Sequence, residues 1–291
     1  MKVLLTGAHG QLGRSLQQSH PSHWTLTALG SGQLDVSDEH AVRRRVEALR
    51  PALIVNAAAY NAVDLAEEQR ERAFAVNAWG PLFLARAAND AGARLVHVST
   101  DYVFDGRTGR PYGEQAKPNP LNAYGASKLQ GEQWVLENQP QAVVLRTAWV
   151  YSALGENFVA AMLRAAGRGR PLRVVDDQVG APTHAGELAK AVIALTEQSA
   201  AGGIYHCSGA TALTRYDFAR AILEAADAME PSNRLSLLTP IPSSEYPSAA
   251  VRPGYSVLDC GKLVALGLSP RPLGETLPGV VRAWLARGLQ P

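Results

Sequence analysis

The sequence predicts an α/β protein whose core is a doubly wound parallel sheet of the Rossmann-like kind, joined to a smaller C-terminal α/β lobe. Two observations carry this prediction. Short apolar runs alternate with helical stretches through the first half of the chain, and a glycine-rich turn separates the first run from the first helix. Strands that alternate with helices form a parallel sheet covered by helices on both faces, and ligands bind beyond the carboxyl ends of its strands.

The first element is a strand at residues 1–6, a short apolar run. The turn after it has a glycine at every third position, Gly7, Gly10 and Gly13, and a helical stretch begins at Arg14. These glycines let the chain turn sharply, bring the backbone close to a diphosphate and allow the helix to pack against the sheet. The helix N-terminus offers free N–H groups and a positive dipole end to phosphates. We therefore predict dinucleotide binding here, with a generic glycine turn as the alternative.

The other elements of the first half follow in alternation. Strands are predicted at residues 24–29, 53–57, 94–100 and 142–148, with helical regions at residues 38–49, 64–91 and 120–137 between them. Asp38 near the start of the first of these helices and Pro51 after its end are typical boundary residues. The ends of three strands carry Gly7, Ala58 and Thr100, which would converge at one edge of the sheet.

The pattern loosens in the second half of the chain. Helices are predicted at residues 156–168, 187–199 and 274–287, strands at residues 172–175 and 203–207, and a proline-rich stretch at residues 240–253. We divide the chain into a dinucleotide-binding domain, residues 1–150, and a smaller substrate-binding lobe, residues 151–291, with some chain crossing back to the first domain.

Composition excludes several classes of partner. The 28 basic and 26 acidic residues give a net charge of +2, so we expect no nucleic-acid partner. No apolar run approaches the roughly 20 residues that span a bilayer, so we expect no membrane partner. Cys207 and Cys260 are too few for a zinc site or a disulfide framework, which favours a reducing compartment. We expect a cytoplasmic monomer or homodimer whose first strand follows no signal peptide.

One tyrosine–lysine pair is the strongest chemical signal. Tyr124 and Lys128 lie four residues apart on a predicted helix, so they share one face. A phenol beside a fixed ammonium group is easier to deprotonate than its ordinary pKa of about 10 suggests. Such a phenol can trade a proton with a carbonyl or an alcohol. Taken alone, the spacing also fits an ordinary pair on a helix surface.

Several segments together resemble the extended short-chain dehydrogenases/reductases, and within them the family of dTDP-4-dehydrorhamnose reductases. The matching stretches lie at residues 6–13, 56–59, 62–64, 99–104, 120–129, 146–151, 177–183 and 252–254. The glycines and the tyrosine–lysine pair are common to the whole superfamily. The run at residues 99–104, Trp149 and Gln178 narrow the resemblance to the family.

The resemblance implies a reaction and its catalytic residues. Members of the family reduce the 4-keto group of dTDP-4-dehydro-L-rhamnose with NADPH or NADH, and the product, dTDP-L-rhamnose, serves polysaccharide biosynthesis. By position, Tyr124 would donate the proton to the keto oxygen. Lys128 would hold the nicotinamide ribose and lower the pKa of the tyrosine. Thr100 would hydrogen-bond the same oxygen, so that the developing charge is stabilised from two sides.

The resemblance also implies two sets of binding residues. The cofactor set is Gly7, Gly10, Gln11, Leu12, Gly13, Asp35, Val36, Ala59, Tyr60, Asn77, Tyr124 and Lys128. The substrate set is Thr100, Asp101, Trp149, Gln178 and Arg252. A Thr-Asp pair at a strand end is also a common helix cap, so Thr100 and Asp101 have a structural alternative.

The chain departs from the family pattern at three places. Leu29 at the end of the second strand is followed by Gly30 rather than by an acidic residue, so nothing repels a 2′-phosphate and we predict that NADPH is accepted and preferred. Arg14 stands where some relatives carry a glutamate of an intersubunit magnesium site, so we predict no metal. Tyr255 replaces the asparagine of a late Arg-Pro-x-Asn-Ser motif, which puts one contact of the second lobe in doubt.

Two alternatives to this function stay open. One is another sugar-nucleotide reductase, epimerase or dehydratase of the same superfamily. Dehydratases use extra carboxylates beside the threonine, and the sequence Asp101-Tyr102 favours a reductase. The other is a non-catalytic NADP-binding regulatory subunit, like that of methionine adenosyltransferase. The intact Thr100, Tyr124 and Lys128 argue against it.

Overall fold

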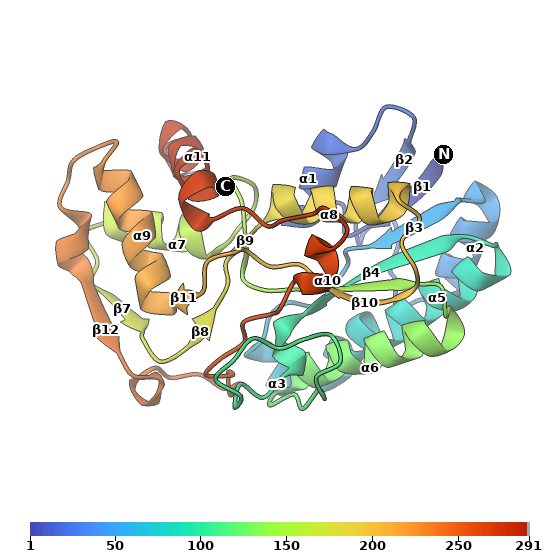
Figure 1. Cartoon of the computed structure of the whole chain (residues 1–291), viewed down its shortest axis with the longest axis horizontal. Helices are drawn as coiled ribbons and strands as arrows, with labels where there is room; N and C mark the ends of the chain where they lie inside the picture. Colours follow the sequence, from blue (N-terminus) through green and yellow to red (C-terminus); the bar gives the residue numbers. More distant parts are fainter. Residues whose placement is uncertain (290–291) are drawn as a thin grey trace.

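A six-stranded parallel sheet forms the centre of the larger lobe in the computed structural model, which describes residues 1–289 (Figure 1). Its strands are β1 (Lys2–Thr6), β2 (Thr25–Leu29), β3 (Leu53–Asn56), β4 (Arg94–Thr100), β5 (Val143–Thr147) and β10 (Gly203–His206). They lie in the order β10-β5-β4-β3-β1-β2, and every neighbouring pair is parallel. The predicted doubly wound fold is therefore confirmed. The order reverses between β1 and β3, and a ligand crevice is expected at that switch point.

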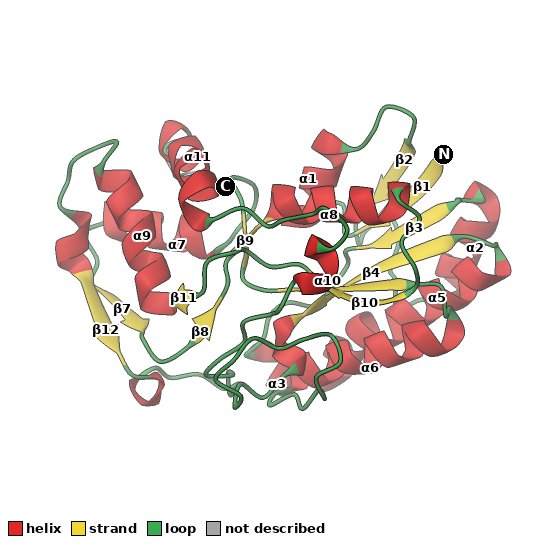
Figure 2. Ribbon diagram, in the orientation of Figure 1, coloured by secondary structure: helices red, strands yellow, loops and turns green. Residues whose placement is uncertain are grey.

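Helices cover both faces of the sheet (Figure 2). One face carries α1 (Gln11–Ser19), α8 (Ala185–Glu197) and the short α10 (Gly261–Val264); the other carries α2 (Glu39–Leu49), α5 (Gly80–Asp90) and α6 (Ala123–Asn138). Alternating strand side chains supply the two cores, because Val3 and Leu5 pack under α1 and α8 while Leu4 packs on the opposite side. This double burial explains why the strands read as continuous apolar runs.

The predicted single helical region at residues 64–91 is wrong in detail. The structure breaks it into α3 (Leu65–Glu68), α4 (Arg70–Phe74), a π-helical turn η1 (Ala75–Trp79) and α5. The π turn carries Asn77, which is fully buried and whose amide bonds the backbone N–H and C=O of Tyr60 at 2.8 and 3.0 Å. A π turn inserts an extra residue into a helix and often marks a functional position. Tertiary hydrogen bonding at Asn77 has here overridden a regular helical pattern.

Within residues 1–289, the smaller lobe contains three helices and three pairs of short strands. The helices are α7 (Phe158–Gly167), α9 (Arg215–Asp227) and α11 (Leu273–Ala286). The strand pairs are β6 (Val150–Tyr151) with β9 (Thr183–His184), β7 (Leu172–Val175) with β12 (Leu238–Ile241), and β8 (Val179–Gly180) with β11 (Leu213–Thr214). The 3₁₀ turn η2 (Asp101–Val103) directly follows β4 of the larger lobe, whereas η3 (Arg234–Leu237) and η4 (Ser243–Glu245) belong to the smaller lobe. Tyr151, Phe218 and Trp284 lie in its core.

Helix α9 was not predicted from the sequence. Its signal is a capping pattern, because Thr214 precedes Asp217 by three residues and the Thr214 hydroxyl accepts a hydrogen bond from the Asp217 N–H at 3.0 Å. The chain also crosses back: α8 and β10 return to the large sheet although they follow residue 150. The division of the chain at that residue stays a prediction. None of the described helices is long and apolar enough to cross a membrane.

Candidate active site

The glycine turn between β1 and α1 has a shape that only glycine permits. Gly7 has a φ of +71°, and a Cβ there would lie 2.5 Å from the Ala57 carbonyl carbon. A Cβ on Gly13 would lie 2.2 Å from the Gly7 oxygen. Gly10 caps α1 without a side chain, so the first-turn N–H groups of α1 have no intrahelical or side-chain acceptor. The turn therefore offers an open cradle for phosphate groups.

Helix α6 brings Lys128 under the carboxyl end of β4. The Asn122 side chain caps the helix, since its Oδ1 accepts from the Gly125 N–H at 2.8 Å. Lys128 is only 2% exposed, and its Nζ donates to the Val98 carbonyl oxygen at 2.6 Å. Burial lowers the pKa of Lys128 to about 8, so the side chain changes charge near the neutral range.

Tyr124 lies one turn earlier on α6 and is half-buried. Its hydroxyl faces the Asn61 Oδ1 at 3.5 Å, and its ring packs edge-on against Tyr102. Burial raises the pKa of Tyr124 above its ordinary value, although hydrogen bonding to Thr100 opposes the rise. The expected lowering of this pKa is not seen, because burial of the phenol outweighs it; the Lys128 ammonium group donates to the Val98 oxygen. A phenol that stays protonated is suited to donate a proton.

Thr100 ends β4 and Asp101 follows it. Thr100 caps the 3₁₀ turn η2, and both residues line the central cavity. The Thr100 hydroxyl accepts from the Tyr102 N–H at 3.2 Å and donates to Asp101 Oδ1 at 3.1 Å. The second oxygen of Asp101 accepts from the Ser256 hydroxyl at 2.5 Å. Asp101 is only 2% exposed, and burial raises its pKa to about 6. This carboxyl group therefore titrates within the working range of many enzymes.

One cavity of about 340 Å³ joins the glycine turn to the catalytic candidates. Ten predicted residues line it: Gly10, Gln11, Leu12, Gly13, Ala59, Thr100, Asp101, Tyr124, Lys128 and Trp149. Among lining residues that sequence reasoning missed, the buried hydroxyls of Ser99 and Thr147 have no hydrogen-bond partner within residues 1–289. Both lie at the carboxyl ends of central strands, and this position in the sequence could have identified them as site residues. The cradle and these free hydroxyls fit a dinucleotide.

Trp149 holds a strained position between the two lobes. Its φ is +47°, which is unfavourable for a bulky side chain. The Arg215 guanidinium carbon lies 3.6 Å from the centroid of its ring, and Gly180 lies against the indole, where an added Cβ would be 2.4 Å from Trp149 Cε2. Backbone strain of this kind persists where the surroundings fix one conformation, often at a functional site.

Substitution Gly180→Ala is expected to displace this indole. The new methyl group overlaps a rigid ring held by Arg215, so the loss should fall on substrate binding, with a rise in substrate KM of about tenfold and an unchanged cofactor KM. Steady-state kinetics with each substrate varied in turn would test this. Gly274→Ala is the matched control, because open space surrounds Gly274. An unchanged substrate KM in Gly180→Ala would contradict the role given to Trp149.

The remaining predicted residues lie outside the central cavity. Gly7 lies at the start of the turn after β1, and the Asn77 side chain hydrogen-bonds the backbone of Tyr60. Asp35 is exposed after β2 and Val36 is buried in the core beside it, so their roles toward an adenine stay predictions. Gln178 and Arg252 line a separate pocket of the smaller lobe.

That pocket is rich in arginine. It is lined by Phe158, Met162, Arg173, Val174, Val175, Gln178, Arg215, Tyr246 and Arg252. Three guanidinium groups around one hollow suit an anionic group such as a diphosphate. Arg215 connects this pocket to the central cavity, since it packs on Trp149, which lines that cavity.

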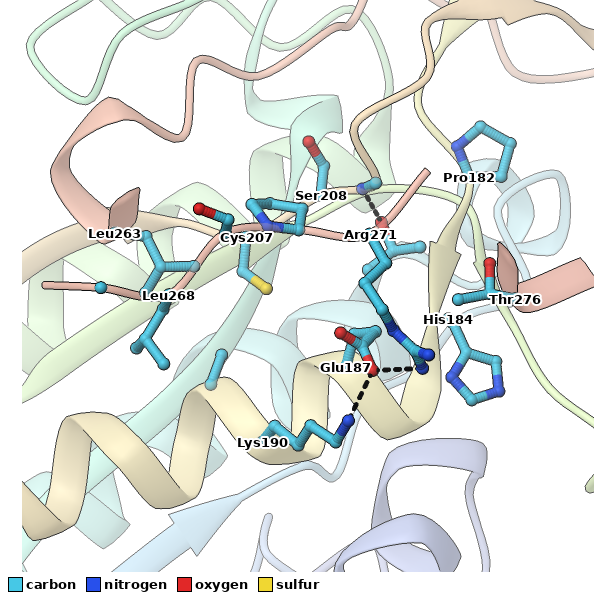
Figure 3. A pocket seen from close by; sticks show the side chains of 16 residues that line it. Pro182, His184, Glu187, Lys190, Cys207, Ser208, Leu263, Leu268, Arg271 and Thr276 are labelled. Atoms are coloured by element: carbon cyan, nitrogen blue, oxygen red, sulfur yellow. Dashed lines mark hydrogen bonds and ion pairs between the residues drawn. The ribbon is translucent and has the colours of Figure 1, made fainter. Parts of the chain in front are cut away.

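A third cavity lies beside α8, and Figure 3 shows its lining. Glu187 accepts hydrogen bonds there from Lys190 Nζ at 3.0 Å and from Arg271 Nη2 at 2.7 Å (Figure 3). Cys207 lies at its wall, and burial raises the pKa of this thiol, so it stays neutral. None of the predicted site residues lines this cavity, and its one carboxylate, Glu187, is paired with both Lys190 and Arg271.

The parallel sheet, the glycine turn and the Tyr124–Lys128 pair at one cavity define a dinucleotide-dependent oxidoreductase of the extended short-chain dehydrogenase/reductase class. A family model described as the RmlD substrate binding domain matches residues 1–285. A dTDP-4-dehydrorhamnose reductase of Aggregatibacter actinomycetemcomitans is 39% identical over 287 residues, which cover 96% of this chain and 98% of the relative. The chain belongs to the RmlD substrate binding domain family, and the predicted resemblance is confirmed.

Solved structures agree with this assignment. A dTDP-4-dehydrorhamnose reductase from Clostridium acetobutylicum superimposes with a TM-score of 0.91 at 36% identity, covering 98% of this chain and 100% of the other. The dTDP-4-dehydrorhamnose reductase from Bacillus anthracis, solved in complex with NADP, gives a TM-score of 0.89 at 34% identity, covering 98% and 99%. The likeness extends over both lobes.

Proposed function

We propose that this protein reduces the 4-keto group of dTDP-4-dehydro-L-rhamnose to the alcohol of dTDP-L-rhamnose with NADPH. The observation that carries the proposal is the meeting of Thr100, Tyr124 and Lys128 at one cavity with the glycine turn. NADPH, when bound, supplies the hydride that goes to the keto carbon. The family's reductases and the complex of one of them with NADP support this reaction and cofactor.

The protein's own groups complete the reduction at the oxygen atom. The Tyr124 hydroxyl gives its proton to the keto oxygen as the carbon receives the hydride, so that C=O becomes CH–OH. The raised pKa keeps this phenol protonated before the reaction. Thr100 can stabilise the same oxygen by a second hydrogen bond. Lys128, as an ammonium group, stabilises the tyrosinate left behind and holds the ribose hydroxyls.

Substrate recognition is assigned to the interface between the lobes. The sugar would lie against Asp101 and Trp149, and the diphosphate would reach the arginine-rich pocket of Arg215 and Arg252. Arginine matches phosphate oxygens with paired N–H donors, which explains why it suits this role better than lysine. The cytoplasmic location and the monomeric or homodimeric state stay predictions.

The decisive experiment follows NADPH oxidation at a fixed wavelength with dTDP-4-dehydro-L-rhamnose made in situ by the preceding enzymes. Rapid oxidation with dTDP-L-rhamnose as product supports the proposal. Oxidation only with a different keto sugar nucleotide would replace the substrate and keep the reaction class. NADPH binding without oxidation of any such sugar would favour a binding-only regulatory protein.

NADPH is expected to give a higher kcat/KM than NADH. Position 30 is a glycine and carries no carboxylate, and a Cβ there would lie 2.3 Å from the His9 ring, which would have to move. Substitution Ser31→Asp places a carboxylate at the next, exposed position and should lower kcat/KM for NADPH on the order of tenfold by repelling the 2′-phosphate. Ser31→Asn is the matched uncharged control. A wild-type preference for NADH would overturn the expectation.

A further inference from the structure

Residues 248–256, here called the clasp, join the two lobes beside the active site. The clasp follows β12 and η4 of the smaller lobe and leads to α10 on the large sheet (Figure 1). The Val179 N–H of β8 donates to the Gly254 oxygen at 2.8 Å. The Asn122 amide, which caps the catalytic helix α6, donates to the Val251 oxygen at 2.8 Å. The clasp therefore contacts the substrate lobe and the catalytic helix at once.

Arg252 fastens the first half of the clasp to the larger lobe. Its guanidinium group donates to both oxygens of Asp64, with Nη2–Oδ2 at 2.7 Å and Nη1–Oδ1 at 3.1 Å. The Ser248 hydroxyl and the Ala250 N–H also donate to Asp64 Oδ1, at 2.8 and 3.1 Å. Hydrogen bonding from Arg252 lowers the pKa of Asp64 to about 2, so the carboxylate stays charged at working pH. A carboxylate with four donors holds Arg252 in one orientation.

Ser256 fastens the second half of the clasp to the reaction centre. Its hydroxyl donates to Asp101 Oδ2 at 2.5 Å, and Ser256 and Asp101 are 1% and 2% exposed. The other oxygen, Oδ1, accepts from Thr100. Ser256 thereby fixes which oxygen of the carboxyl group faces Thr100. Because the hydroxyl of Thr100 has one proton, its orientation toward Asp101 decides whether that proton is free for the substrate.

We propose that the clasp positions one substrate-binding side chain at each of its two ends. Ser256 is a positioning residue for Asp101, and Asp64 is a positioning residue for Arg252. The proposal rests on the proposed function, because Asp101 and Arg252 are assigned there to the substrate. It explains the late Arg-Pro-x-x-Ser sequence: its arginine and its serine bind two acidic residues that lie far apart in the chain.

Substitution Ser256→Ala tests the end of the clasp at Asp101. The groups that face Asp101 are Thr100, Ser256, Arg215 and Tyr124. Loss of the serine donor removes a bond that favours the ionised carboxyl group, so the inflection of Asp101 in the pH profile of kcat/KM should move about one unit to higher pH. Ser256→Thr keeps the hydroxyl and should restore the profile, while the exposed Ser236→Ala should leave it unchanged. A lower rate with an unmoved inflection would overturn the proposal.

Substitution Asp64→Asn tests the end of the clasp at Arg252. The expected result is a rise in KM for the nucleotide sugar of about tenfold, with kcat and the KM for NADPH within twofold, because Arg252 lines the arginine-rich pocket and not the central cavity. Asp64→Glu keeps the charge and should recover most of the affinity. An unchanged sugar KM, or equal changes for sugar and NADPH, would overturn the proposal.

A binding measurement separates this proposal from the proposed function. If the wild-type protein does not turn over the keto sugar, the proposed reaction fails, and calorimetric titration with dTDP still tests the clasp. Binding weakened about tenfold in Asp64→Asn would then support the clasp, and unchanged binding would overturn it. Thermal unfolding of each variant within a few degrees of wild type establishes that the fold is intact. If Asp64→Asn does not fold, Ser248→Ala, which removes one donor to Asp64, takes its place and should weaken binding in the same direction.

Discussion

Substitution Tyr124→Phe is expected to remove most of the turnover and leave NADPH binding intact. The change deletes one hydroxyl group and keeps the ring, so the edge-on contact with Tyr102 remains. A positioned proton donor contributes on the order of 10²–10⁴ in rate, and kcat should fall by that factor. Burial keeps the phenol protonated, so Tyr124 is available as the proton donor at neutral pH. The measurement is kcat from NADPH oxidation, together with Kd for NADPH from fluorescence titration.

The matched control for this prediction is Tyr216→Phe. Tyr216 packs against a core cluster of the smaller lobe and lines neither the central cavity nor the arginine-rich pocket. It should keep wild-type kinetics, which separates loss of the catalytic hydroxyl from a general effect of removing a phenol. Near-normal turnover in Tyr124→Phe would remove Tyr124 from the mechanism. A parallel loss of NADPH binding would instead assign it to the cofactor site.

Local signals made the large lobe predictable from the sequence. The turn requires glycine at two positions, because Gly7 has a positive φ and a Cβ on Gly13 would overlap the Gly7 oxygen, so the residue types reveal the turn directly. The strands are buried on both faces and read as unbroken apolar runs. Asn122 caps α6 at the expected start of the catalytic helix. In each case the determinant and the structure lie within a few residues of one another.

Contacts between distant residues were not predictable in the same way. Asp64 and Arg252 are 188 residues apart, and Asp101 and Ser256 are 155 apart, so no spacing rule connects them. The π turn at Asn77 depends on Tyr60 and on α6, neither of which the helical pattern encodes. Some crossing back of the chain was predicted, but packing decides that the returning strand is β10. The sequence therefore did not predict the long-range contacts that hold the smaller lobe against the active site.

Substitution Lys128→Met is expected to weaken catalysis while it removes a cost to folding. In the proposed reaction the ammonium group of Lys128 stabilises the tyrosinate and holds the ribose hydroxyls, so kcat/KM should fall on the order of 10²–10³ and NADPH should bind less tightly. The fold, however, buries this amine, and burial lowers its pKa from 10.5 to about 8. A shift of this size corresponds to about 3 kcal/mol at neutral pH. Lys128→Met removes this cost and so raises the free energy of unfolding. The variant also loses the hydrogen bond to the Val98 oxygen, which offsets about 1–3 kcal/mol of that increase.

The pH dependence of stability isolates this effect. Between pH 8 and 10.5 the unfolded chain holds a proton on Lys128 that the folded chain has released, so wild-type stability gains from this residue as the pH rises through that window. Lys128→Met lacks that gain, and the difference in unfolding free energy between wild type and variant should change in favour of wild type from pH 8 to pH 10. The exposed Lys117→Met should show no such change. A constant difference across the window would mean that Lys128 is not held in a desolvated site, and the account of its role in binding the cofactor and the tyrosinate would fall with it.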